Sequence, residues 1–497
     1  IREFIETPFY RILATIGEQG QTFEGEWRAV KGSKWFESFD LYKENGFKER
    51  EKAQQVIDYL TQEQPVIGQI ASIEKKKEKK NPPLLFNLAE LQNECSKRFK
   101  ISPDETLKIA QELYEKKLTT YPRTDARVLS TAVAKEIHKN LNGLMKYEPA
   151  VPFLQEIVSF GSHKGLVKTR YVNDKQITDH YAIIPTGQGM SALNSLSWRS
   201  KAVYDVIVKR FLSIFYPAAV YQKVAITVKV KEESFFASFK VLAEPGYLKV
   251  VGIPGAKNNT DGGNSDENTE NMASSQAFFE KIQSLKKGMT LPIQGMEIKE
   301  GKTSPPKRYN SGSLILAMEN AGQLIEDEEL RAQIKGSGIG TSATRGEILK
   351  KLFNNKYLAL NKKTQIVTPT MLGEMIYDVV DHSVRSLLNP ELTASWEKGL
   401  TYVADGDITS EEYMMKLDRF VSSRTEGVKG LNNQYQLRAC YDRVAPFYKN
   451  EKTTSRSGQA KSGTKTGTKT GTKSSKKAST KNKYVLKSGG IKKCLKK

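Results

Sequence analysis

The chain has 497 residues, of which 38% are hydrophobic, and it carries a net charge of +22. This size and apolar content suit roughly three or four folded domains. The sequence holds no run of about 18 apolar residues and no recognisable signal peptide, so we expect neither membrane insertion nor secretion. Its cysteines, Cys95, Cys440 and Cys494, are scattered without a Cys-x-x-Cys pair, which argues against disulfides and a zinc ribbon.

Alternating apolar and polar residues predict strands near the start of the chain. Residues 9–16 and 21–27 are predicted to form a hairpin across the turn at 17–20. Residues 66–73 predict a further strand by the same alternation. A basic run follows at 75–80, and we interpret it as a solvated exit from that strand.

A helix is predicted to begin after Ser102, which caps it, with Pro103 at the first helical position and Glu105 completing a capping box. Apolar residues then recur at helical spacing, so this helix should bury one face. That face consists of Leu107, Ala110, Leu113 and Tyr114. Ser130 is predicted to cap the next helix, which leaves residues 119–125 in a short connection, where functional side chains are commonly displayed.

This connection contains the most informative stretch of the chain, Leu-Thr-Thr-Tyr-Pro-Arg-Thr-Asp at 118–125. A tyrosine can attack a phosphodiester and hold the product as a phosphotyrosine ester. Its free hydroxyl is a poor nucleophile, with a pKa of roughly 10, so the negative charge that develops must be stabilised. Arg123 suits this task because its planar fork can bind two phosphate oxygens. The pair Tyr121 and Arg123 therefore suggests phosphoryl transfer, and a buried tyrosine beside a surface arginine is the alternative.

Other segments accompany this stretch in a fixed order. They are Pro-Pro-Leu-Leu-Phe-Asn-Leu-Ala-Glu-Leu-Gln at 82–92, the capped helix at 101–118, Ala-Arg-Val-Leu-Ser at 126–130, Ile-Thr-Asp-His-Tyr-Ala-Ile-Ile-Pro-Thr at 177–186 and Lys-Gly-Ser-Gly-Ile-Gly-Thr-Ser-Ala-Thr-Arg at 335–345. Together, over roughly residues 1–435, they resemble the bacterial type IA DNA topoisomerases, most closely topoisomerase III. The resemblance implies that Tyr121 is the nucleophile of a 5′-phosphotyrosine link and that Arg123 supports the scissile phosphate.

His180 is one of four histidines, and a lone histidine is usually structural. Its context, Thr178-Asp179-His180 before an apolar run, matches the family segment whose histidine faces the cleaved phosphate. The resemblance therefore implies that His180 donates a hydrogen bond or a proton to the phosphate. Tyr181 stands where the family often has a second histidine, which leaves the role of that neighbour open.

A glycine-rich loop at 335–345 leads into a predicted helix at 345–352. Backbone NH groups at such a helix start can bind an anion, and nearby hydroxyls and a guanidinium add donors. A simple turn before a capped helix is the alternative. At Asn310-Ser311 the chain departs from the Thr-Glu that is usual in the family, which weakens any polar contact expected there. We expect the DNA backbone to be contacted by Arg127, Arg170, Arg308, Lys335, Thr341, Ser342, Thr344 and Arg345.

We expect an α+β multidomain protein. Alternation at Val224, Ile226, Val228 and Val230 and again at 235–242 predicts more strands after a helical stretch, so a helical domain lies between two portions of a β domain. The resemblance implies a type IA arch with this inserted domain carrying the tyrosine and a mainly helical DNA-holding domain. The expected limits are 1–82 and 214–300 for the β gate domain, 83–213 for the helical insertion, 301–440 for the DNA-binding domain and 441–497 for a basic tail. Residues 255–275, rich in Asn, Asp and Gly, predict a surface linker.

The resemblance also implies a Toprim domain whose carboxylates hold Mg²⁺, and we find no such domain in this sequence. The chain starts without Met in family sequence that follows this domain, so we expect a fragment that binds single-stranded DNA without cleaving it. Asp405-Gly-Asp407 is a formal Asp-x-Asp in a polar, turn-like stretch, and we assign it no metal role. No metal ligands are predicted, and Mg²⁺ is expected only in the complete enzyme.

The positive charge is concentrated at the end of the chain. Residues 451–497 hold 15 Lys or Arg against one Glu, a net of +14, which leaves +8 for the other 450 residues. Gly-Thr-Lys repeats and few apolar residues predict a disordered tail that binds phosphate backbones in a salt-dependent way. A plain solubilising tail is the alternative.

Two other classes of protein remain as alternatives. A tyrosine recombinase or type IB-like enzyme needs an Arg, His, Arg set and a tyrosine near the C-terminal end, whereas Tyr121 lies early in the chain. A non-catalytic, architectural nucleic-acid-binding protein needs only the charge and the tail. The expected partner is single-stranded DNA, with RNA as a further candidate, and we expect a monomer that is cytoplasmic and nucleoid-associated.

Overall fold

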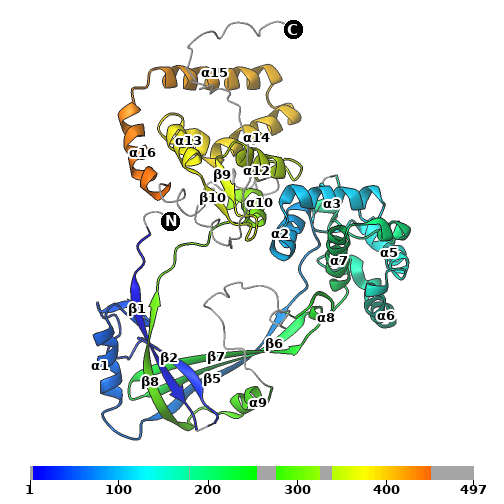
Figure 1. Ribbon diagram of the computed structural model, residues 1–497. Helices are drawn as coiled ribbons and strands as arrows, with labels where there is room; N and C mark the ends of the chain where they lie inside the picture. The colour runs from blue at the N-terminus through cyan, green and yellow to red at the C-terminus, as the bar shows by residue number, and fades with distance from the viewer. Residues whose placement is uncertain (1–3, 19, 178, 254–275, 325–337, 449–497) are drawn as a thin grey trace, which may run out of the picture. The chain divides into compact units, whose positions relative to one another are not determined.

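The computed structural model describes residues 4–18, 20–177, 179–253, 276–324 and 338–448 (Figure 1). The chain divides into two compact units, Ile1–Val444 and Ala445–Lys497, and only the first four residues of the second unit are described. The first unit combines a large antiparallel sheet with many helices, which confirms the α+β class. Among the described helices, none is both long and apolar enough to cross a membrane. The predicted linker at 255–275 lies outside the described residues.

One antiparallel sheet dominates the described strands. The strands are β1 (Pro8–Ile16), β2 (Phe23–Arg28), β3 (Leu41–Lys43), β4 (Gly46–Phe47), β5 (Ile67–Lys80), β6 (Ala219–Val230), β7 (Glu233–Glu244), β8 (Thr290–Lys302), β9 (Leu358–Leu360) and β10 (Val367–Pro369). Their order in the large sheet is β2-β7-β6-β5-β8-β1-β4-β3, and β9 pairs with β10 separately. Because β2 also pairs with β1, the six strands β2, β7, β6, β5, β8 and β1 form a closed ring of hydrogen-bonded neighbours.

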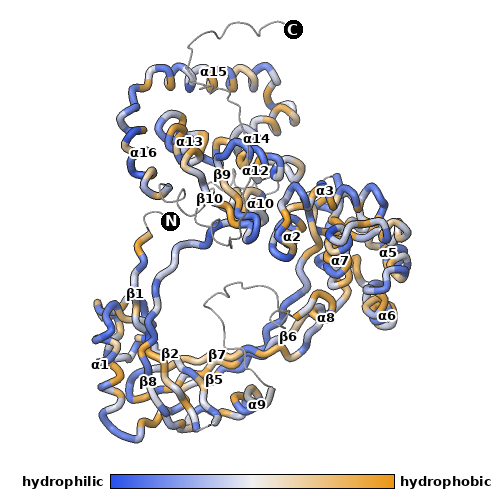
Figure 2. The backbone as a smooth tube through the Cα atoms, viewed as in Figure 1, coloured by the Kyte–Doolittle hydropathy of each residue, from blue (hydrophilic) through white to orange (hydrophobic). Residues whose placement is uncertain are grey.

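The predicted hairpin is confirmed, since β1 pairs with β2. The strands predicted around 224–230 and 235–242 are confirmed as β6 and β7, which pair with each other. The interpretation of residues 75–80 as a strand exit is wrong, because β5 continues through the basic run and pairs with β6 as far as Lys80↔Ala219. The lysines are tolerated there because all five are exposed. Glu78, between them, lies 3.1 Å from the Lys240 ammonium of β7 and 3.6 Å from that of Lys223 of β6. Figure 2 shows this half of β5 as hydrophilic.

The sheet encloses an apolar core that draws on residues 12–70 and 224–282. Trp27 is fully buried in it and stacks on Phe47, with ring centroids 5.0 Å apart. The buried carboxylate of Glu233 accepts hydrogen bonds from the Trp27 indole at 2.7 Å, the Ser33 hydroxyl at 2.6 Å and the Lys34 backbone NH at 2.8 Å. Glu233 therefore fastens the turn after β2 to the start of β7.

We predict that Glu233→Ala destabilises the sheet by about 3 kcal/mol or more, because it leaves buried donors without an acceptor. Hydrogen exchange of the β2 and β7 amides measures this loss locally. Glu244→Ala, at the exposed end of the same strand, is the matched control. A loss no larger than that of the control contradicts the role assigned to Glu233.

Helices make up most of the remaining described chain. The α-helices are α1 (Arg50–Leu60), α2 (Leu88–Phe99), α3 (Pro103–Glu115), α4 (Thr131–Lys135), α5 (Ile137–Leu144), α6 (Val151–Phe160), α7 (Trp198–Ser213), α8 (Leu248–Val251), α9 (Gln276–Ser284), α10 (Ser311–Glu319), α12 (Arg345–Asn354), α13 (Met371–Asp381), α14 (Pro390–Asp405), α15 (Ser410–Lys429) and α16 (Gln434–Tyr448). Short 3₁₀ helices are η1 (Glu148–Ala150), η2 (Ser162–Lys168), η3 (Asp174–Gln176), η4 (Met190–Ser195), η5 (Ala321–Leu324) and η6 (Arg385–Leu388).

The predicted helix starts on either side of the tyrosine are confirmed. Ser102 accepts from the Glu105 NH at the start of α3, and Ser130 accepts from the Val133 NH at the start of α4. The predicted capping box is only half formed, because the Glu105 carboxylate pairs with Arg199 at 2.7 Å. Tyr114 was predicted to be buried with the apolar face of α3, but the residue is 40% exposed, and its ring lies edge-on to that of Tyr121.

A second large apolar core draws on residues 85–250 and includes α2, α3 and α7. A third and much smaller core joins α2 to α10 and α12 and contains three buried residues, Ala89, Ile315 and Leu349. Backbones approach closely there, since a Cβ added at Gly312 of α10 would lie 2.6 Å from the Asn93 Cα of α2. The domain limits expected from the sequence stay predictions.

Candidate functional site

The tyrosine segment between α3 and α4 is paired with a distant part of the chain, residues 180–186. The Thr120 NH donates to the Ile184 carbonyl at 3.0 Å, and the Thr120 hydroxyl donates to the Ala182 carbonyl at 3.0 Å. The Thr124 hydroxyl donates to the His180 carbonyl at 2.8 Å. These bonds hold the two segments side by side and fix their register.

The pairing brings Tyr121 and His180 into contact, with ring centroids 4.4 Å apart and planes tilted by 44°. Tyr114 meets the other side of the Tyr121 ring edge-on, at 5.4 Å. Tyr121 is partly buried and His180 is exposed. Within the described part of the chain, the Tyr121 hydroxyl has no hydrogen-bond partner, so it can accept or donate to a bound group.

These rings line a pocket of about 360 Å³. Its walls are Tyr114, Lys117, Thr119, Thr120, Tyr121, His180, Tyr181, Thr186 and Gln188. The lining contains aromatic rings, hydroxyls, an amide and one lysine, but no carboxylate. Burial raises the pKa of the Tyr181 phenol, which therefore stays neutral beside the site. This composition suits a ligand with both a flat apolar face and negative charge.

Arg123 lies two residues beyond Tyr121, after the buried Pro122. Its side chain is partly buried and forms no hydrogen bond or ion pair with any residue that the structure describes. The guanidinium is thus not committed to a described carboxylate. The sequence prediction that Tyr121 and Arg123 act together stays a prediction, while the contact between Tyr121 and His180 is an observed feature of the fold.

We predict that Thr124→Val loosens the pairing of the two segments at a cost of about 1 to 2 kcal/mol, because the His180 carbonyl and the Ala126 NH lose their partner. Hydrogen exchange of amides at 119–126 and 180–186 should increase. Thr425→Val removes a comparable hydroxyl on exposed α15 and serves as the control. Equal exchange in the two variants would refute the assignment.

The predicted DNA-contacting arginines occupy different environments. Arg127 pairs with Glu90 at 2.6 Å and is partly buried. Arg170 is exposed, with its guanidinium carbon 5.9 Å from the centre of the Tyr171 ring. Arg308 is exposed beside a largely apolar pocket of about 910 Å³ at α12 and α13. The predicted Lys335 lies outside the described residues.

The loop before α12 uses its own hydroxyls to order its backbone. The Thr341 NH donates to the Thr344 hydroxyl at 2.9 Å, and the Thr341 carbonyl accepts from the Arg345 NH at 3.1 Å. Thr341 and Thr344 are exposed, whereas Ser342 is buried. The predicted helix at 345–352 is confirmed as α12.

Arg345 differs most from the prediction. It was expected to contact a DNA phosphate, yet it is fully buried, with its Nη1 3.1 Å from the Asp125 carboxylate and 3.9 Å from that of Glu319. Paired carboxylates from two distant segments hold it away from the surface. No sequence motif predicted this network. The only indication was that Asp125 is the last residue of the tyrosine-containing stretch at 118–125.

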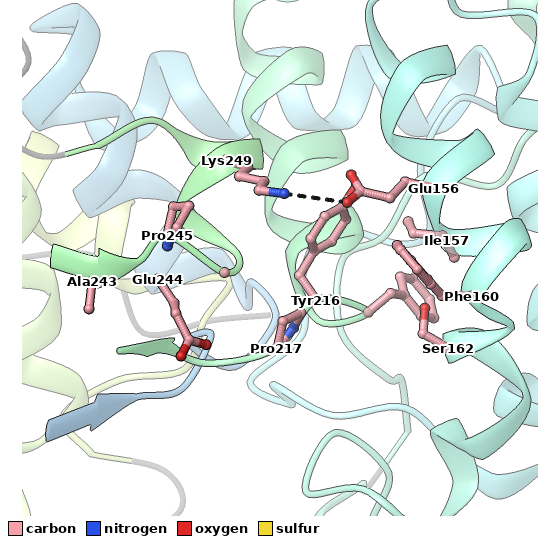
Figure 3. Close-up of a pocket in the computed structure, with 12 residues that line it drawn as sticks. Glu156, Ile157, Phe160, Ser162, Tyr216, Pro217, Ala243, Glu244, Pro245 and Lys249 are labelled. Atoms are coloured by element: carbon pink, nitrogen blue, oxygen red, sulfur yellow. Dashed lines mark hydrogen bonds and ion pairs between the residues drawn. The ribbon is translucent and has the colours of Figure 1, made fainter. Parts of the chain in front are cut away.

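A larger pocket of about 520 Å³ lies where α6, the end of α7 and the end of β7 meet (Figure 3). Its walls are mostly apolar, with Phe160 and Tyr216 facing the cavity, and an ion pair of 3.5 Å joins Lys249 to Glu156. It contains none of the residues predicted to act in phosphoryl transfer or DNA contact.

The described residues do not fit a divalent metal. No three His, Cys, Asp or Glu side chains within the described ranges come together in a way that could hold a metal ion. Asp405 is the last residue of α14, and Gly406 ends that helix in the left-handed conformation.

Comparison with known proteins decides the family. A family model described as DNA topoisomerase matches residues 1–415. The chain belongs to this family. The resemblance to type IA, topoisomerase III-like proteins that was drawn from the motifs is thereby confirmed.

Individual relatives agree with the family. The chain is 31% identical over 442 residues to DNA topoisomerase 3 of Bacillus subtilis (strain 168), an alignment that covers 88% of this chain and 55% of that protein. It is also 31% identical over 371 residues to DNA topoisomerase 3 of Bacillus licheniformis, covering 74% of this chain and 48% of the relative. The chain thus spans about half the length of the curated relatives it matches.

The fold has a solved counterpart. Full-length topoisomerase I from Thermotoga maritima superposes with a TM-score of 0.56, at 21% sequence identity, over 85% of this chain and 59% of that one. This similarity supports the type IA architecture at the level of the fold.

Proposed function

We propose that this chain supplies the tyrosine-bearing part of a type IA, topoisomerase III-like enzyme that breaks, passes and rejoins a single DNA strand without ATP. The observation that carries the proposal is the contact between Tyr121 and His180, with ring centroids 4.4 Å apart, on a pocket free of carboxylates. Arg123, two residues from the tyrosine, completes the proposed set.

In the proposed reaction, the Tyr121 oxygen attacks phosphorus and loses its proton, while the bond to the 3′ oxygen breaks and that oxygen takes up a proton. The product is a 5′-phosphotyrosine ester, which conserves the bond energy for rejoining. Arg123 stabilises the phosphoryl oxygens, and His180 donates to one of them. We propose Mg²⁺ as the cofactor of the complete enzyme, where it would supply positive charge to stabilise the phosphoryl group.

Single-stranded DNA is the proposed substrate, because the rings of Tyr114 and Tyr181 at the pocket suit unstacked bases. The exposed arginines Arg170 and Arg308 and the hydroxyls of the loop before α12 are proposed backbone contacts. Strand passage requires the helical insertion to move while it is attached to one DNA end, with the β strands as the hinge.

We predict that residues 1–497 alone bind single-stranded DNA without cleaving it. When they are mixed with a separate Toprim domain from a topoisomerase 3 relative and Mg²⁺, a covalent adduct to labelled single-stranded DNA should form. Tyr121→Phe should abolish the adduct, because it lacks the nucleophilic oxygen. The conservative control Tyr402→Phe, on α14, should leave adduct formation unchanged. Denaturing gels and sequencing of the attached DNA end measure the outcome.

Each contrary result of that experiment identifies another class of protein. If wild-type and Tyr121→Phe mixtures behave alike, the architectural reading replaces the enzymatic one. If the DNA is attached through its 3′ end, a recombinase or type IB-like reaction replaces the type IA reaction.

The charged end of the chain yields a separate prediction. Removing residues 451–497, which carry a net charge of +14, should weaken binding to single-stranded DNA and flatten the dependence of log K on log salt concentration. The slope should remain the same if the segment only increases solubility. Fluorescence anisotropy across a salt series distinguishes these results.

A further inference from the structure

We propose that Arg345 is a positioning residue: it clasps the tyrosine segment against α10 and α12 through a buried ion-pair network. This role rests on the proposed function, because it concerns how the proposed nucleophile is held. The geometry assigns Arg345 to the protein interior and not to the DNA, which separates this role from the phosphate contact expected of the loop at 335–345.

The network joins three segments that are far apart in the sequence. Arg345, at the start of α12, has its Nη1 3.1 Å from Asp125 and 3.9 Å from Glu319, the last residue of α10. Its Nε donates to the Ile339 carbonyl at 3.3 Å. The side chain is 1% exposed, whereas that of Asp125 is 39% exposed. The arginine therefore depends on its protein partners for hydrogen bonds, since water reaches it poorly.

Asn87 links the same groups from the side of α2. Its amide donates to the Glu319 carboxylate at 2.7 Å and to the Asp125 carbonyl at 3.1 Å, while its Oδ1 caps α2 by accepting from the Glu90 NH. Burial raises the pKa of Glu319, and the charge of Arg345 acts in the opposite direction. The network thus binds both the side chain and the backbone carbonyl of Asp125, at the end of the tyrosine segment.

The clasp reaches the site through Thr124. Asp125 lies four residues after Tyr121, and its neighbour Thr124 donates to the His180 carbonyl and accepts from the Leu88 NH at 3.1 Å. A shift of Asp125 therefore displaces the bond that sets His180 beside Tyr121. Arg345 thus acts on the pair through this segment, by way of Asp125 and Thr124.

The clasp lies beside a small apolar core. The apolar core shared by α2, α10 and α12 contains three buried residues, Ala89, Ile315 and Leu349, whereas the cores of the sheet and of the helical region are far larger. Further apolar side chains of α10 and α12 pack against this core while staying partly exposed, and the charged groups would regain water if the helices separated. A buried ion pair adds little net stability but demands one geometry, which suits a contact that must re-form in register.

The decisive variants are Arg345→Met, which removes the charge at similar length, and Arg345→Lys, which restores it. In the full chain without DNA, Arg345→Met should raise hydrogen exchange of amides at 118–127 and 311–319 by about tenfold or more, and Arg345→Lys should recover part of the protection. Arg11→Met removes another partly buried arginine pair, with Glu26 in the sheet, and should leave these amides unchanged.

In the mixture with the Toprim domain and Mg²⁺, Arg345→Met should lower the rate of adduct formation by about tenfold while the Kd for single-stranded DNA changes less than about twofold. If Arg345 only stabilised the fold, the rate of adduct formation would not fall more than the affinity for single-stranded DNA. Should Arg345→Met fail to fold, Asp125→Asn, at the partly exposed end of the pair, gives the same exchange readout.

The outcomes separate the clasp from the proposed reaction. Unchanged exchange in Arg345→Met overturns the clasp, and unchanged exchange with a weaker Kd assigns Arg345 to DNA contact instead. Raised exchange with an unchanged rate of adduct formation overturns its positioning role. If the wild-type mixture forms no adduct, the proposed function fails, and the exchange data still decide whether the clasp exists.

Discussion

The pairing of residues 119–124 with 180–186 is the interaction on which the site depends. Thr120 and Thr124 use both backbone and side-chain groups to hold the second segment, so two stretches separated by about sixty residues keep a fixed register. The contact between Tyr121 and His180 is a consequence of that register. A one-residue slip would turn the ring of His180 away from the tyrosine, because neighbouring side chains of an extended segment point in opposite directions.

Charge in this molecule serves two distinct purposes. Exposed cations such as Arg170 and Arg308 and the basic run of β5 stay in water, where they can attract an anion over long range. Arg345 is buried, and its charge is paired with the carboxylates of Asp125 and Glu319. The same residue type therefore differs in role according to burial, which composition and net charge do not reveal.

Much of the fold was predictable from local rules. The caps at Ser102 and Ser130 and the alternation in β6 and β7 are short-range signals, and the structure follows them. The basic run was misread because strand pairing with β6 overrides the low β propensity of lysine. Tyr114 was misread because helical spacing places it on the apolar face of α3 but cannot show how completely other elements cover that face. The network around Arg345 was missed because it joins residues 87, 125, 319 and 345, and no local pattern encodes such a meeting.

The three apolar cores differ greatly in size, and this difference affects which helices could separate during strand passage. The sheet and the helical region around the tyrosine each have an extensive core, so hydrophobic burial keeps each intact. The contact of α2 with α10 and α12 has a small core, close backbones at Gly312 and polar links such as the hydrogen bond between Ser96 and Ser311. Polar groups lose less on separation than apolar surface does, because water replaces their partners. Polar links therefore contribute a larger share of this contact than they do of the two extensive cores, and such links demand one geometry when the contact forms.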